Sequence, residues 1–261
     1  MNLQTRDTLH SWFQAFAAGY AGGDGALHPM LRLKLDHSRR VADDSRAIAA
    51  ELGWPDDDQR TAEVIGLLHD AGRFPQFARH RTFFDPSSVD HGECGYETVQ
   101  ASDALNACGD GDARLILDGI RWHNRRRVPA ALPPASLPFL KLIRDADKLD
   151  ILLLVNDTLK RGRHKDCPEI MLNIELAGGP NPDLIREIRE QRSGSYEHVK
   201  TLADMRLMRL SWVYDTNYAP TFRRLVERRL MEDMCDSLPD TPDIRAIVDG
   251  AQRHMEERLK G

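Results

Sequence analysis

Apolar residues recur along this chain three and four positions apart, the spacing that gathers side chains on one face of an α-helix. The strict alternation of apolar and polar positions that is typical of strands is nearly absent, and Ala, Leu, Arg, Glu and Asp fill the periodic segments. The pattern therefore predicts an all-α fold. We expect a single domain over residues 1–261, with a helical core at about residues 31–160 and a C-terminal helical extension at about residues 161–261.

Several of the predicted helices carry a histidine or an aspartate on the face that should be buried. These residues are His37 in the segment 33–52, His91 in the segment 91–105, for which Asp90 is a candidate cap, His123 in the segment 112–123 and Asp147 in the segment 140–154. A further apolar run, residues 64–68, ends in the pair His69-Asp70, and the helix-stopping residues Gly72 and Pro75 follow. Because an unpartnered polar group is costly to bury, these six residues need partners in the interior.

Each of the six residues has an ordinary alternative explanation. A single inward-facing histidine is more often hydrogen-bonded within a core than bound to a metal ion. A buried aspartate is usually paired with a cationic side chain. Six independent cases of this kind in one interior are a poor explanation, whereas a divalent cation satisfies imidazoles and carboxylates together. The set therefore predicts a metal site.

The order of these residues resembles a known family, the HD-domain metal-dependent phosphohydrolases. The matching pattern is His37, then His69-Asp70, then Asp147. The run HSRRVADDSRAIAAELG is similar to the opening helix of that family and IRDADKLDIL to its closing motif, so that the resemblance covers about residues 31–160. His91 and His123 match the additional histidines of the six-ligand subgroup. The resemblance implies an HD-domain helical bundle that holds two metal ions with Asp70 as the bridge between them.

The predicted ligand set narrows the choice of metal and of chemistry. Mixed imidazole and carboxylate ligands suit manganese, iron, cobalt, nickel or zinc better than calcium. Six protein ligands are too many for one catalytic ion that keeps open positions, so we expect two divalent transition metal ions. Two ions activate a water molecule and clamp the oxygens of a phosphoryl group. The leading hypothesis is hydrolysis of a small soluble phosphorylated compound, such as a nucleotide.

Cationic residues near the predicted ligands are candidates for substrate binding. They are Arg73, Arg125, Arg144 and Lys148. A planar guanidinium holds a phosphate through two hydrogen bonds, and Arg73 follows Asp70 by three residues, so we expect these two residues to be the catalytic ones. Asp150 has two open interpretations, because it could orient a ligand histidine or pair with a local arginine.

Composition limits the classes of protein to which the chain can belong. A formal charge of −5 argues against general nucleic-acid binding. No apolar run reaches membrane-spanning length, and no N-terminal signal pattern occurs. The four cysteines form no Cys-x-x-Cys pair, which argues against a zinc ribbon. We expect a cytoplasmic enzyme whose partner is its small-molecule substrate, and nothing in the sequence indicates an oligomeric state.

The sequence leaves two other functions open besides hydrolysis. The six-ligand pattern resembles that of di-iron HD-domain oxygenases, and the cationic residues favour hydrolysis unless the oxygenase substrate is a phosphonate. A catalytically inactive binding module is the third hypothesis, and the filled ligand positions argue against it.

Residues 74–90 and 125–138 are predicted loops, and the aromatic residues of the first are compatible with closure as a lid.

Overall fold

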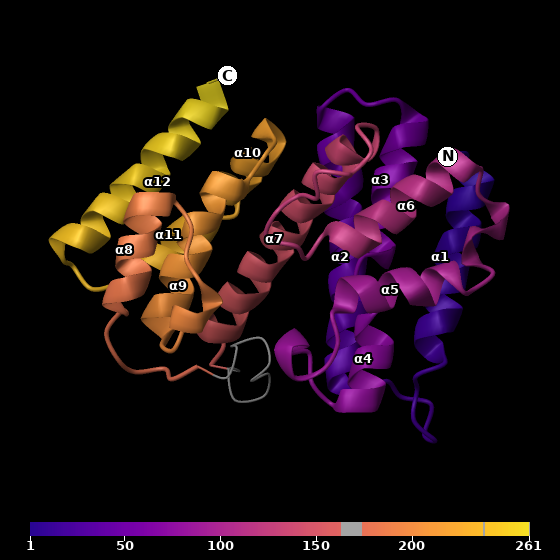
Figure 1. Cartoon of the computed structure of the whole chain (residues 1–261), viewed down its shortest axis with the longest axis horizontal. Coiled ribbons are helices and arrows are strands. Elements are labelled where there is room, and N and C mark those ends of the chain that lie inside the picture. The colour runs from indigo at the N-terminus through magenta and orange to yellow at the C-terminus, as the bar shows by residue number, and fades with distance from the viewer. Residues whose placement is uncertain (163–173, 237, 261) are drawn as a thin grey trace. The chain divides into compact units, whose positions relative to one another are not determined.

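The computed structural model of the chain describes residues 1–162, 174–236 and 238–260 (Figure 1). In this described part every regular element is a helix, and the one strand-like pairing is an isolated bridge between Glu175 and Thr201. The predicted all-α fold is confirmed. Cys167 and the rest of residues 163–173 of the expected C-terminal extension lie outside the described residues.

The chain divides into two compact units, Met1–Asp150 and Ile151–Gly261. The helix α7 (Ser136–Lys160) runs through the boundary. The expected single domain stays a prediction. Across the described ranges, no helix combines the length and the apolar character needed to cross a lipid bilayer.

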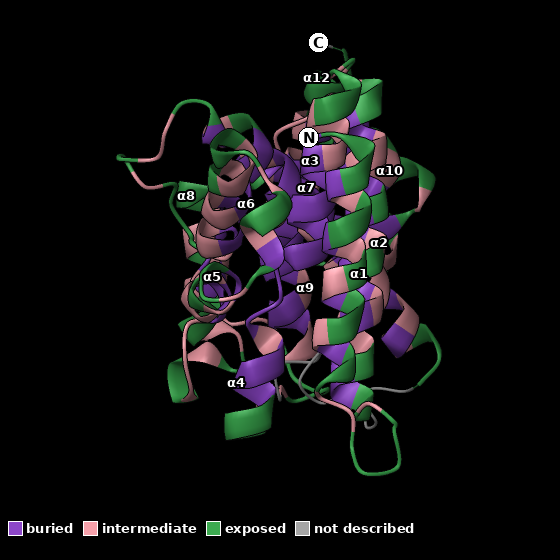
Figure 2. Ribbon diagram, turned by 90° about the vertical axis from the view of Figure 1, so that its right-hand side faces the viewer, coloured by how far each residue is buried: buried purple, intermediate pink, exposed green. Residues whose placement is uncertain are grey.

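The first unit carries all of the predicted site residues. Besides the start of α7, its helices are α1 (Leu3–Ala18), α2 (Pro29–Glu51), α3 (Asp56–Leu68), α4 (Arg73–His80), α5 (His91–Gln100) and α6 (Asp110–Trp122), with the short 3₁₀ helices η1 (Asp85–Ser87) and η2 (Ala104–Ala107). Asp90 caps α5 as expected, because its side chain accepts a hydrogen bond of 3.0 Å from the backbone N–H of Glu93. Buried residues line the inward faces of these helices (Figure 2).

Close packing of α2 on α3 brings two of the predicted ligand positions together. A side chain at Gly66 on α3 would place its Cβ 2.9 Å from both Ala42 Cα and Val41 O on α2. Only glycine permits this approach of the two backbones. As a result, His37 on α2 and His69 at the end of α3 lie on the same interior.

A second glycine contact fixes the turn after His69-Asp70. A Cβ at Gly72 would collide with the backbone of His91 and of Gly95 on α5. The helices α5 and α6 in turn lie side by side (Figure 1). The turn that holds Asp70 is therefore held directly against the helix that begins with His91.

Three of the predicted element boundaries are wrong, and the first is that the predicted loop 125–138 ends early, because α7 already begins at Ser136. Residues 74–80 belong to α4 rather than to a loop, because Pro75 lies in the first turn, where a missing N–H breaks no helical hydrogen bond. The helix that starts at His91 ends at Gln100 instead of continuing to residue 105. The Ser102 hydroxyl donates to Val99 O at 2.8 Å and accepts from Ala104 N at 3.2 Å, and such local bonds compete with helix continuation.

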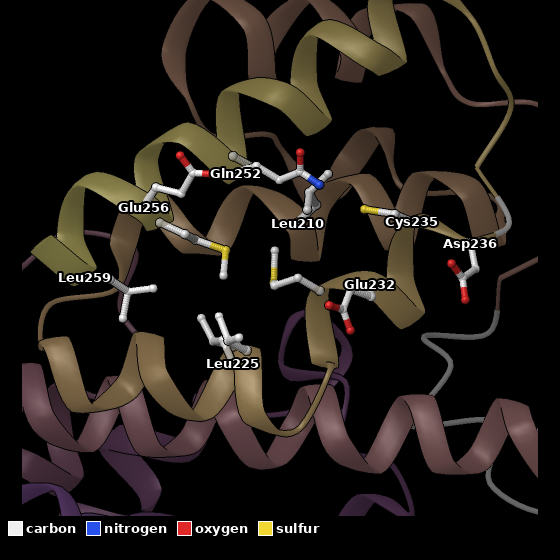
Figure 3. Close-up of a pocket in the computed structure, with 12 residues that line it drawn as sticks. Leu210, Leu225, Glu232, Cys235, Asp236, Gln252, Glu256 and Leu259 are labelled. Carbon is white, nitrogen blue, oxygen red and sulfur yellow. The ribbon is translucent and has the colours of Figure 1, made fainter.

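The described part of the second unit contains the end of α7 and further helices. They are α8 (Pro182–Gln191), α9 (Leu202–Leu210), α10 (Ala219–Glu227), α11 (Leu230–Cys235) and α12 (Pro242–Lys260), with the 3₁₀ helices η4 (Tyr196–His198) and η5 (Ser211–Asp215). A mostly apolar cavity of about 490 Å³ lies between α10, α11 and α12, and Glu232, Asp236 and Glu256 are among the residues that line it (Figure 3). None of the predicted metal ligands lines this cavity.

Candidate metal centre

His37 and His69 form the first pair of facing imidazoles. Both side chains are buried, and their Nε2 atoms lie 3.2 Å apart. The Nδ1 atom of His37 lies 2.6 Å from Asp150 Oδ2, and that of His69 lies 2.7 Å from Gly66 O. Because each Nδ1–H donates to an oxygen, a neutral imidazole in either position has its lone pair on Nε2. The two lone pairs therefore point at each other.

His91 and His123 repeat this arrangement. His91 is the first residue of α5 and His123 caps the end of α6, and their Nε2 atoms lie 3.1 Å apart. The Nδ1 atom of His91 lies 2.5 Å from Asp85 Oδ2, and that of His123 lies 2.8 Å from Ile120 O. A second pair of Nε2 lone pairs thus faces the interior.

Asp70 lies between the two histidine pairs and offers a different oxygen to each pair. Its Oδ2 atom is 3.5 Å from His37 Nε2 and 3.6 Å from His69 Nε2. Its Oδ1 atom is 3.6 Å from His91 Nε2 and 3.7 Å from His123 Nε2. This geometry is that of a carboxylate able to bind one ion on each side.

Asp147 adds another oxygen to the first pair. Its Oδ1 atom lies 3.2 Å from His37 Nε2 and 3.7 Å from His69 Nε2. Donor atoms around a tetrahedral ion with bonds of about 2.1 Å are about 3.4 Å apart. The spacings at both groups agree with this value, so the donors present fit divalent metal ions. The structure brings all six predicted ligands together, and their role as ligands stays a prediction.

Both carboxylates at the centre are ionised. Burial alone would raise the pKa of Asp70, but the positive charge of Lys34 outweighs burial and holds this pKa well below its usual value. For Asp147, burial again acts to raise the pKa, and the contacts with His37 and His69 outweigh burial and hold it well below its usual value. Both side chains therefore offer anionic oxygens at neutral pH.

The imidazoles differ in their protonation. Burial, and then the charge of Arg73, lower the pKa of His91 to about 4, and burial also lowers the pKa of His69. Burial acts in the same direction on His37, but hydrogen bonding to Asp147 and Asp150 outweighs it and raises this pKa. A proton and a divalent ion therefore compete for the Nε2 lone pair of His37.

Asp85 is a residue of the site that the sequence did not reveal. Besides its contact with His91, its Oδ1 atom accepts hydrogen bonds from Arg73 Nη1 at 2.8 Å and from Gln76 Nε2 at 2.9 Å. It lies in the short helix η1, in a segment without apolar periodicity. An aspartate six residues before His91 has no regular spacing that would single it out.

Lys34 and Asp150 could have been assigned from helical spacing. Lys34 lies one turn before His37 on α2, and its Nζ atom donates to Asp70 Oδ2 at 2.7 Å. Both interpretations of Asp150 are found, because it contacts His37 and also accepts a hydrogen bond of 2.6 Å from Arg40 Nε. Each residue shares a face with a predicted ligand.

Arg73 lies at the centre as expected, although much of its hydrogen-bonding capacity is used within the chain. Its Nε atom is 3.5 Å from Asp70 Oδ1. Its Nη1 atom donates to Gln76 Oε1, Phe83 O and Asp85 Oδ1 at 2.7–2.8 Å. Its binding to a substrate stays a prediction.

The other predicted substrate-binding residues lie around the same ligands. Arg144 is buried, and its Nη1 atom donates to the backbone carbonyls of His123 and Arg125 at the end of α6. The half-exposed side chain of Arg125 pairs with Asp90 at 3.1 Å. Lys148 follows Asp147 on α7 and is partly buried. These contacts stabilise the segments that carry ligands, and the binding of these three residues to a substrate stays a prediction.

Comparison with known proteins identifies the part of the chain that carries this centre. No curated protein and no solved structure matches the chain. Residues 35–152 match the family model of the HD domain. All six converging residues and Asp150 lie within this range, and HD domains are helical modules that bind divalent metals. Residues 35–152 of this chain are therefore similar to the HD domain, and their clustered histidines and aspartates are compatible with the metal site of that domain.

Proposed function

We propose that the protein is a phosphohydrolase that uses two divalent transition metal ions to hydrolyse a small phosphorylated compound. One observation supports this function best. The Nε2 atoms of the four histidines face each other in two pairs, at 3.2 and 3.1 Å, and one oxygen of Asp70 is directed to each pair. Neutral imidazoles repel each other in this arrangement unless a cation lies between them. The two groups with Asp70 in common therefore favour two ions over one.

The chain's own residues prepare these donors. Asp150 and Asp85 hold the Nδ1 protons of His37 and His91, which fixes the tautomer and turns Nε2 inward. Backbone carbonyls do the same for the other two histidines. When bound, two ions would supply an activated water molecule and stabilise negative charge on the phosphoryl group. The cationic side chains near Asp70 would then hold the substrate in place.

The test is a substrate screen with a defined metal content. The protein is loaded with manganese, iron, cobalt, nickel or zinc and offered phosphorylated metabolites, including nucleotides, with and without oxygen. We expect release of inorganic phosphate that does not depend on oxygen and that is lost in Asp70→Ala. Oxygen consumption coupled to product formation by the iron-loaded protein would instead identify an oxygenase. A fully loaded protein that turns over none of these compounds would point to the binding module.

A further inference from the structure

Lys34 is a cation that lies beside the metal centre and is absent from the proposed ligand set. Its Nζ atom donates to Asp70 Oδ2 at 2.7 Å, and its side chain is only 15% exposed. Lysine is rarely buried without a partner. Among the described residues, its one hydrogen-bond partner is the carboxylate that we propose to be shared between two ions.

Lys34 and Arg73 approach the same carboxylate and the same aromatic ring. Arg73 Nε lies 3.5 Å from Asp70 Oδ1, while Lys34 contacts Oδ2. Each cation also lies 5.6 Å from the centroid of the Phe83 ring. Arg73 is fixed there by Asp85, whereas Lys34 has a flexible four-carbon chain. Of the two, Lys34 has the greater freedom to move its charge to a ligand.

The charges at a loaded centre favour an anion beside Lys34. Asp70 and Asp147 supply two negative charges. Two divalent ions would carry four positive charges, so the loaded centre would have an excess of positive charge. The ammonium group of Lys34 adds to this excess, whereas Asp85 offsets the charge of Arg73. Once Asp70 is shared with metal ions, its attraction for Lys34 falls. A phosphoryl group bound at the centre then offers the ammonium group more negative charge than Asp70 does.

We propose that Lys34 binds the phosphoryl group of the substrate, exchanging its contact with Asp70 for a contact with a phosphoryl oxygen. This inference rests on the proposed function. The proposed role differs from a role in which Lys34 only positions Asp70. Removal of a positioning residue would alter the metal content of the protein. Removal of a substrate-binding residue would alter the affinity for phosphate at full metal content.

Calorimetric titration of inorganic phosphate into the metal-loaded protein tests this proposal. We expect Lys34→Ala to raise the Kd for phosphate about tenfold or more, the effect of one charge-assisted hydrogen bond, with metal content unchanged. Lys34→Arg should keep part of the affinity. Arg39→Ala is the matched control, since it removes a positive charge from the same helix at a side chain that is 47% exposed. Its Kd should stay within about twofold of wild type.

Three results would overturn the proposal, and they separate it from the proposed function. Wild-type phosphate affinity in metal-loaded Lys34→Ala would show that Lys34 does not touch the ligand. Loss of metal from Lys34→Ala and from the length-matched Lys34→Met would assign Lys34 to the positioning of Asp70. Failure of loaded wild-type protein to bind phosphate at all would contradict the phosphohydrolase function as well.

Discussion

At the scale of single residues, the orientation of the four histidines decides what the centre can bind. Each Nδ1 atom has an oxygen partner within 2.8 Å, so each Nε2 atom is left for the interior. Two of these partners are carboxylates and two are backbone carbonyls. A carboxylate makes the imidazole a stronger donor to a metal ion than a carbonyl does. The residues that orient the ligands are therefore expected to affect metal affinity.

Asp85→Ala should weaken the binding of one ion and leave the other in place. Asp85 orients His91, which belongs to the second pair, and contacts neither His37 nor His69. Removal of such a partner lowers metal affinity about 10- to 100-fold. Metal titration followed by elemental analysis should show one ion retained and one lost at limiting metal.

The control for this variant is Asp103→Ala, which removes an exposed aspartate that makes no side-chain cap. It should bind both ions as wild type does. Equal weakening of both ions in Asp85→Ala, or no weakening at all, would contradict the division of the ligands into two groups.

The six converging residues could be predicted from the sequence because each is marked by helical spacing or by the end of an apolar helix. A polar residue such as Asp147 on the stripe of Leu140 and Ile143 is conspicuous. Asp85 could not be predicted, because its contact with His91 depends on the path of an irregular segment. The intramolecular partners of Arg144 and Arg125, the backbone and an aspartate, could not be predicted either, and the roles of these two residues toward a substrate stay predictions.

At the scale of helices, glycine contacts set the distance between the segments that carry the ligands. Gly66 lets α3 approach α2, and Gly72 lets the turn after Asp70 touch α5. The sequence predicted these helices well and their ends less well. The sequence predicts Pro75 to be a stop signal, but it lies in the first turn of α4, and both functions of proline fit the sequence equally. The contacts of the glycines depend on tertiary packing, which spacing does not reveal.

Gly72→Ala should destabilise the protein and disturb the group of predicted ligands that Asp70 forms with His91 and His123. The added Cβ would collide with the backbone of His91 and Gly95, so the turn and α5 must separate. We expect a loss of about 1–3 kcal/mol in the free energy of unfolding, measured by denaturant titration.

Gly111→Ala is the matched control, because a Cβ at Gly111 meets nothing within 4 Å. It lies within α6, where alanine is favoured over glycine by about 0.5–1 kcal/mol. Stability of Gly72→Ala equal to that of wild type would show that the turn and α5 are not in contact.

At the scale of the whole molecule, the six converging donors, five of which are buried, couple metal binding to folding. Without a cation, the native state holds the ionised, buried carboxylate of Asp70, the partly exposed one of Asp147 and facing imidazole lone pairs close together. A ligand that binds only the folded state stabilises it by about 2.7 kcal/mol at a free concentration of 100 times its Kd. Metal binding should therefore raise the stability of the unit Met1–Asp150.

Chelation of the loaded protein should lower its Tm by about 5–10 °C, and added metal should restore it. The measurement is differential scanning calorimetry before and after dialysis against a chelator. Asp70→Ala is the control, because a variant that cannot bind either ion should show no response to the chelator. A loaded wild-type protein with the same Tm after chelation would mean that the buried donors hold no metal.

The most direct test of the account is the metal content of fully active protein. Elemental analysis of wild-type protein at maximal activity should give about two ions per chain, since the donors form two groups that share Asp70. Asp70→Ala should contain almost none, while His123→Ala should retain about one. A single ion per chain in fully active wild-type protein would contradict the dinuclear centre.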